Sequence, residues 1–279
     1  MVKYELIPEQ LLYEGTITED QFFHPLPLTE EVILKTHDSG YWDRLKKQEI
    51  TPKEARKIGF PMTKNLVERG RVIANGTIDC ARFAQKHGVA MNVAGGTHHA
   101  FRDRGEGFCV LNDIAIAANE LLDQGEAHKI LIIDLDVHQG NGTANIFEHE
   151  PRVFTFSMHG AKNYPLHKER SDLDVGLPDQ TGDELYLSTL RTHLPRLFQE
   201  VEPDLAFFLS GVDVLETDKL GRMALTKAGC RERDQFVFEQ CQLNGVPVAV
   251  SMGGGYSPRV ADIVEAHANT FRMAQSVFF

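Results

Sequence analysis

The pattern of hydrophobic and polar positions along the chain changes near residue 89. Before that point helix start signals dominate: Thr29 precedes an acidic pair at 30–31, and residues 51–54 (TPKE) form a capping box with proline at the first helical position. After it, short apolar runs alternate with longer amphipathic segments, as the strand–helix repetition of a parallel sheet requires. The pattern predicts strands at 89–94, 130–135, 153–157, 205–209 and 246–251, and helices at 114–124, 183–200, 226–243 and one that opens at 257–258.

Composition narrows the class of protein. With 279 residues, 42% of them apolar, the chain can bury one large core, so we expect a single α/β domain over residues 1–279 with a mostly parallel sheet flanked by helices. The net charge of −11 argues against nucleic-acid binding, which favours a clustered basic face. No apolar run approaches the roughly 18 residues that span a membrane, so a soluble protein is expected. Four widely separated cysteines without a C-x-x-C pair predict reduced thiols and a cytoplasmic location.

Four of the five predicted strands run directly into a polar or glycine-rich cluster. These clusters are 95–99 (GGTHH), 134–138 (DLDVH), 211–213 (GVD) and 253–256 (GGGY). Open α/β sheets bind ligands beyond the carboxyl ends of their strands. We therefore expect the four clusters to converge at one edge of the sheet.

Asp136 and His138 are the first candidate metal ligands. They are one residue apart at the end of an apolar strand, so their side chains point to the same face. A carboxylate and an imidazole suit zinc, whose catalytic sites take three protein ligands and leave one position open, and Asp213 is the third candidate. The alternative is that Asp134 and Asp136 cap a following turn or helix.

His98, His99 and Tyr256 are the candidate catalytic groups. Histidine titrates near neutrality, so an adjacent pair can divide the roles of general base and general acid. A solvated loop or a separate metal site are the alternatives for this pair. Tyr256 follows three glycines and precedes a helix, so its hydroxyl could stabilise an oxyanion, the alternative being a phosphate cradle at a helix N-terminus.

The remaining histidines carry no second ligand at a useful spacing, so surface or capping positions are expected for them. They are His24, His37, His87, His128, His149, His167, His193 and His267. His159 lies just past a predicted strand, and the sequence leaves its role open.

Five motifs in a fixed order resemble the histone deacetylase superfamily: the four clusters above, extended to 95–100 and 134–142, together with 107–113 (GFCVLND). The resemblance runs from about residue 25 to the C-terminus, and Gln139 with Asn141 makes it most similar to the class IV branch and its bacterial relatives. It implies the arginase/deacetylase fold and one zinc ion bound by Asp136, His138 and Asp213.

The resemblance also assigns further residues. It implies that Asp134 is the carboxylate behind His98 and that Asn141 stands behind the second histidine. The substrate channel would be lined by Gly107, Phe108 and Gly254. A structural potassium ion would lie near Asp134, Asp136, His138 and Ser157.

Three features of the sequence depart from the family pattern. Class I members have an aspartate where this chain has Asn141, and a neutral amide should raise the pKa of His99 less than a carboxylate. Ser39 stands where class I members carry a rim aspartate that binds the substrate backbone. The family also begins with a strand and a loop ahead of the segment that corresponds to residues 3–6, so either the start is misplaced or an edge strand and part of the channel rim are missing here.

The predicted function is removal of acetyl or other acyl groups from lysine side chains by a zinc-dependent hydrolase. The same residues would serve an amidohydrolase of acetylated polyamines, and a pocket without turnover would be an acyl-lysine-binding module. A ureohydrolase with two manganese ions needs more aspartate ligands than the single one at 213 supplies. The expected partner is an acylated lysine or amine.

Overall fold

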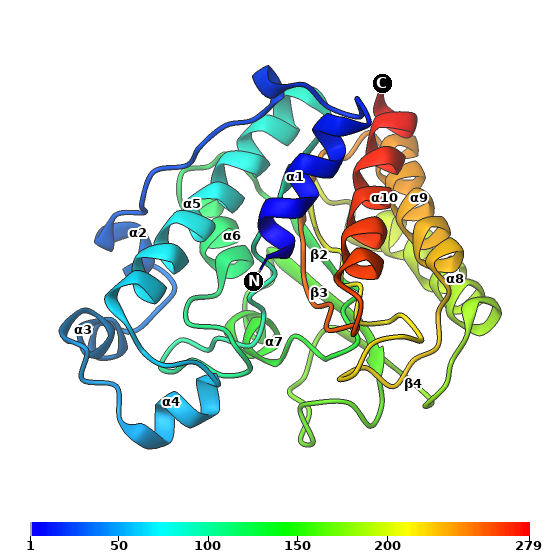
Figure 1. Ribbon diagram of the computed structural model, residues 1–279. Coiled ribbons are helices and arrows are strands. Elements are labelled where there is room, and N and C mark those ends of the chain that lie inside the picture. Colours follow the sequence, from blue (N-terminus) through cyan, green and yellow to red (C-terminus); the bar gives the residue numbers. More distant parts are fainter. Residues whose placement is uncertain (1) are drawn as a thin grey trace.

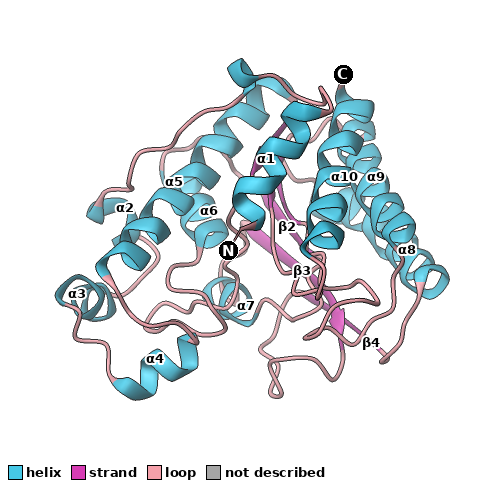
Figure 2. Cartoon of the chain, in the orientation of Figure 1, coloured by secondary structure: helices cyan, strands magenta, loops and turns pink. Residues whose placement is uncertain are grey.

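A parallel sheet with helices on both faces forms the core of the computed structural model, which describes residues 2–279 (Figures 1 and 2). The strands are β1 (Val89–Asn92), β2 (Ile130–Asp134), β3 (Val153–Gly160), β4 (Leu173–Leu177), β5 (Leu205–Leu209) and β6 (Val248–Ser251). Within the described chain they follow the order β1-β6-β5-β2-β3-β4, and every neighbouring pair is parallel. The predicted α/β class is confirmed.

The strands differ from the prediction in five places, two of which are the ends of β1, at 92 rather than 94, and of β2, at 134 rather than 135. Strand β4 was not predicted: it lies at the sheet edge, and only its last residue, Leu177, is buried. Strand β3 continues three residues beyond 157, because it pairs with β4 as far as Gly160. Strand β6 begins at Val248 rather than 246, because Pro247 has no N–H to donate to a neighbouring strand.

The longer helices cover the sheet, and short ones fill the first third of the chain. They are α1 (Lys3–Tyr13), α2 (Glu30–Leu34), α3 (Ser39–Lys47), α4 (Pro52–Ile58), α5 (Lys64–His87), α6 (Asp113–Asp123), α7 (Asn141–Phe147), α8 (Asp183–Val201), α9 (Lys227–Leu243) and α10 (Val260–Phe278), with a 3₁₀ turn η1 (Glu19–Gln21).

Both predicted helix starts in the first third are confirmed. In α4 the Glu54 N–H donates to Thr51 Oγ1 at 3.2 Å, and the Thr51 N–H donates back to the Glu54 carboxylate at 2.9 Å. The predicted start of the last helix at 257–258 is wrong by two residues. Ser257 Oγ forms a hydrogen bond with Thr217 Oγ1 at 2.7 Å, and α10 begins only after Arg259.

Strand residues alternate between the two faces of the sheet. In β2, Leu131 and Ile133 pack with α1, α8, α9 and α10, whereas Ile130 and Ile132 pack with α2, α3, α5 and α6. Figure 1 shows these two helix groups on opposite sides of the strands. Strands buried on both faces explain the nearly continuous apolar runs seen in the sequence.

The start of the described chain is helical. Among residues 2–279 the first strand is β1, at the edge of the sheet, and the preceding segment forms helices, with Ile7 and Leu11 of α1 in the core.

In the described part of the chain, no helix combines the length and apolar character needed to cross a bilayer.

Candidate functional site

The four clusters do converge, at the carboxyl ends of β1, β2, β5 and β6. A cavity of about 490 Å³ opens there. Its lining includes all the candidate metal ligands and catalytic groups: Asp136, His138, Asp213, His98, His99 and Tyr256. The sheet topology therefore brings together residues that lie more than 150 positions apart in the chain.

Asp136, His138 and Asp213 form one compact group. One ligand atom from each lies within 4.8 Å of the others. His138 Nδ1 is 3.0 Å from Asp136 Oδ1 and 3.2 Å from Asp213 Oδ2, so the ring nitrogen faces both carboxylates. Two carboxylates and one imidazole around a common point fit a catalytic zinc ion. In the described chain this is the single group of at least three such side chains close enough to hold a metal.

The three side chains of this group change one another's pKa values. Burial lowers the pKa of His138, but hydrogen bonds and charge from Asp136 and Asp213 outweigh it and raise the pKa to about 10. Burial, together with the neighbouring Asp136, raises the pKa of Asp213. The metal-free group therefore retains a proton at neutral pH, which a cation would replace.

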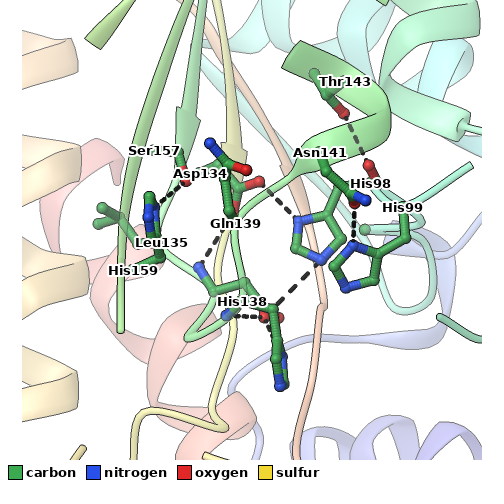
Figure 3. A network of polar contacts seen from close by, with 12 residues as sticks. His98, His99, Asp134, Leu135, His138, Gln139, Asn141, Thr143, Ser157 and His159 are labelled. Carbon is green, nitrogen blue, oxygen red and sulfur yellow. Dashed lines mark hydrogen bonds and ion pairs between the residues drawn. The ribbon is translucent and has the colours of Figure 1, made fainter. Parts of the chain in front are cut away.

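His98 and His99 differ in what stands behind each ring (Figure 3). His98 Nδ1 donates to Asp134 Oδ2 at 2.7 Å, and His99 Nδ1 donates to Asn141 Oδ1 at 2.6 Å. Burial lowers the pKa of His98, but Asp134 and Asp136 reverse the effect and raise it to about 9. For His99, burial and the neighbouring imidazoles hold the pKa well below 6.5. One ring is thus charged and the other neutral at pH 7.

The glycine loop before Tyr256 lies directly against the metal group. Gly254 has φ +30°, and a Cβ there would stand 2.3 Å from the Asp213 carboxylate. The backbone lies so close to this carboxylate that only glycine fits at this position. The Tyr256 N–H donates to Asp218 Oδ2 at 2.5 Å, which ties the end of the loop to the next segment. The Tyr256 side chain is half-buried on the cavity wall.

Aromatic rings form the walls of the cavity above the histidines. Phe108 lies 5.8 Å from Tyr256 and 5.0 Å from Phe60, ring centre to ring centre. The Tyr164 ring meets His99 edge-on at 5.0 Å. A Cβ at Gly107 would lie 2.5 Å from the His99 ring, so only glycine lets this segment approach the histidine.

The comparisons with known proteins agree with this geometry. A family model for the histone deacetylase domain matches residues 1–271. The chain belongs to the histone deacetylase family. An uncharacterized protein of Picosynechococcus sp. is 44% identical over 278 residues, covering 100% of this chain and 93% of that protein. Histone deacetylase 2 of Arabidopsis thaliana is 27% identical, covering 94% of this chain and 70% of its own length.

Solved structures support the same relationship. An HDAC homolog in complex with SAHA has a TM-score of 0.84 and 25% identity, with 97% of this chain and 77% of that chain covered. An HDAC homolog from Aquifex aeolicus has a TM-score of 0.83 at 24% identity, covering 96% and 77% respectively, which shows a common fold. The arginase/deacetylase fold expected from the motifs is confirmed.

The residues expected around potassium in this deacetylase-family chain lie at the end of β2, in the loop that follows it, and in the middle of β3. Asp134 and Ser157 are register partners, with Asp136 and His138 following in the chain. Ser157 Oγ also contacts His159 Nδ1 at 3.0 Å (Figure 3). His159, whose role the sequence leaves open, therefore lies next to one of the residues expected around potassium. Binding of potassium stays a prediction.

Two histidines contradict the expectation of surface or capping positions. His37 is buried: its Nδ1 donates to Phe101 O at 2.8 Å, and the Asn112 N–H donates to its Nε2 at 3.0 Å. His267 is fully buried in α10, where neither ring nitrogen has a hydrogen-bond partner among the described residues. The other six are at least partly exposed, as expected.

Sequence reasoning missed three residues of this deacetylase-like site. Lys3 is buried, and its ammonium donates to the carbonyls of Gly253, at 3.4 Å, and Gly254. Tyr164 lines the cavity, and Arg233 donates to Gly211 O, two residues before Asp213, at 2.6 Å. Neither belongs to a motif that the sequence displays. Ser39, where a rim aspartate was considered, is exposed at the start of α3 and is not a lining residue of the cavity.

Proposed function

We propose that this chain is a zinc-dependent deacylase that removes acetyl or other acyl groups from lysine side chains. The observation that carries the proposal is the single cavity in which the Asp136, His138 and Asp213 group, the His98–His99 pair and Tyr256 meet. Membership of the histone deacetylase family supports hydrolysis of an amide as the reaction class.

The protein side chains divide the work around the metal. When bound to the group of three ligands, zinc would lower the pKa of a water molecule and polarise the acyl carbonyl. His99 is neutral at pH 7, and its Nδ1–H is occupied by Asn141, so its Nε2 would be free to take up a proton from water and to return it to the leaving amine. The Asp134 carboxylate raises the pKa of His98, and the contact between them at 2.7 Å fixes the orientation of the ring.

Tyr256 would stabilise the oxyanion that develops on the substrate carbonyl. Burial raises the pKa of its hydroxyl above the ordinary value, so the group stays protonated and can donate a hydrogen bond. The rings of Phe108 and Tyr164 would pack against the apolar stem of the acylated side chain.

The charge of the lining favours a lysine side chain in a peptide over a free polyamine. The cavity lining includes the cationic side chains Lys57, Lys162 and Arg222, whereas its lining carboxylates are the two metal ligands. Lys57 is paired with Glu106 and Arg222 with Asp179, so Lys162 contributes most of the uncompensated positive charge among these three. A polyamine would bring further positive charges to this surface, and like charges raise the free energy of binding. We accordingly propose that the substrate is an acylated lysine side chain and that residues 1–279 form a single catalytic domain. The four cysteines are free and buried, which supports the proposal that the protein acts in the cytoplasm.

The test is hydrolysis of acetyl-lysine peptides and acetylated polyamines by zinc-loaded protein and by a Tyr256→Phe variant. Loss of one oxyanion donor should lower kcat by about 100-fold or more. Tyr13→Phe, which changes a tyrosine that is 91% exposed, is the matched control and should keep full activity. Full activity in Tyr256→Phe would remove this assignment. Absence of turnover on every acyl amine by a zinc-loaded, folded protein would favour a binding module instead.

A further inference from the structure

Arg233 and Asp234, near the start of α9, are fully buried, with 0% of each residue exposed. Removing two charges from water is costly, and apolar residues of similar volume are often at least as stabilising as a buried ion pair. A contribution to stability is therefore not a sufficient reason for burying this ion pair. Its hydrogen bonds indicate another role.

The guanidinium of Arg233 hydrogen-bonds to two separate strand ends. Its Nη1 donates to Gly211 O at 2.6 Å, beyond β5, and makes a longer contact with Leu135 O at 3.4 Å, beyond β2. Its Nη2 donates to Ser210 Oγ at 2.9 Å, and its Nε donates to Asp234 Oδ1 at 2.8 Å. One rigid, planar group thus joins the two segments.

These two segments carry the two carboxylate ligands. Leu135 immediately precedes Asp136, and Gly211 lies two residues before Asp213. The segments are in close contact at this point, since a Cβ on Gly211 would stand 2.7 Å from the Asp136 Cα. The Val137 N–H also donates to Asp213 Oδ1 at 3.0 Å. A small shift of either segment would change the separation of the carboxylates.

Asp234 fixes the guanidinium from the other side. Its Oδ2 accepts from Thr270 Oγ1 of α10 at 2.8 Å, and its Oδ1 accepts from Ser210 Oγ at 3.3 Å. The orientation of Arg233 is therefore set by two helices packed on the sheet.

We propose that Arg233 is a positioning residue for the metal group: by joining the ends of β2 and β5 it sets the separation of Asp136 and Asp213 and so the affinity for zinc. The inference rests on the zinc site proposed above. Residues that orient metal ligands typically change affinity by about 10- to 100-fold when they are replaced. Lysine keeps the charge but lacks the planar group that donates to the two carbonyls from Nη1 while Nη2 and Nε hold Ser210 and Asp234.

The experiment measures the dissociation constant of Zn²⁺ by competition with a chromophoric chelator, for wild type, Arg233→Lys and Arg233→Met. Both variants should bind Zn²⁺ about 10- to 100-fold more weakly, and the visible spectrum of bound Co²⁺ should shift because the ligand geometry changes. Arg272→Met is the matched control: this arginine also pairs with carboxylates, those of Glu14 and Glu265, but lies outside the cavity lining. Its Zn²⁺ affinity should equal that of wild type, whatever its stability.

Wild-type Zn²⁺ affinity and an unchanged Co²⁺ spectrum in folded Arg233→Lys would overturn the inference. Failure of wild type itself to bind Zn²⁺ would instead refute the proposed metal site. If the arginine variants do not fold, Thr270→Val, which removes one hydrogen bond to Asp234, gives a milder test. A smaller but measurable weakening is expected there, and no change would count against the proposal.

Discussion

The two adjacent histidines predict what a single change at Asn141 will do. His98 and His99 are both buried, and each ring donates from Nδ1 to an oxygen at nearly the same distance, 2.7 Å and 2.6 Å. The oxygen belongs to a carboxylate for His98 and to an amide for His99. Asn141→Asp replaces the amide by a carboxylate of almost the same shape, so it should raise the pKa of His99.

The magnitude follows from the distance. A negative charge about 4 Å from the centre of an imidazolium contributes about 4 kcal/mol at an effective dielectric constant of about 20. Since one pKa unit corresponds to about 1.4 kcal/mol, this is close to 3 units before the cost of burying the new carboxylate. Carboxylates beside opposite charges in proteins produce shifts of about 1–3 units, which is the range expected here.

The assay is an NMR titration of the His99 ring together with the pH profile of kcat/KM. A base is active in its neutral form, so a higher pKa moves the acidic limb of the profile to higher pH by about 1–3 units. Asp134→Asn is the reciprocal control and should lower the pKa of His98 from about 9. A His99 ring in Asn141→Asp that titrates as in wild type would refute the reasoning.

Three other outcomes are expected. Because the pKa of His138 is raised to about 10 without metal, Zn²⁺ binding at pH 7 should release at least one proton, measured by calorimetry in buffers of different ionisation enthalpy; zero release would contradict the account. Gly254→Ala should weaken Zn²⁺ binding, since its Cβ would meet the Asp213 carboxylate, whereas Gly245→Ala, also at positive φ but with nothing within 4 Å, should not. Lys3→Met leaves two loop carbonyls without a donor and should lower the free energy of unfolding in urea by about 1–3 kcal/mol; an unchanged value would show that the ammonium is dispensable.

The sequence predicted best what is encoded locally. Strand β2 is apolar at every position before Asp134, and the cluster that follows places Asp136 and His138 on one face, so both the strand and the ligand geometry could be inferred. The capping box at Thr51 was equally local. Strand β4 was missed because its residues alternate between exposed and partly buried, which gives an edge strand little hydrophobic signal.

The rest depended on contacts between distant residues. Lys3 reaches a loop 251 positions away, and Arg233 reaches Leu135 across 98 positions, so no window of sequence displays either contact. The prediction of surface or capping positions for His37 and His267 was wrong for the same reason, since burial of a polar ring depends on elements that pack around it in three dimensions. Motifs identified the ligands, but the side chains that position them became visible only in the fold.

The most direct test of the central claim is release of free amine from an acetyl-lysine peptide by the zinc-loaded protein, beside an Asp136→Ala/His138→Ala double variant. The account predicts turnover by wild type, loss of turnover on chelation, recovery when zinc is restored, and none in the variant. Turnover that persisted in the folded double variant, or its absence in fully zinc-loaded wild type, would contradict the assignment of this site.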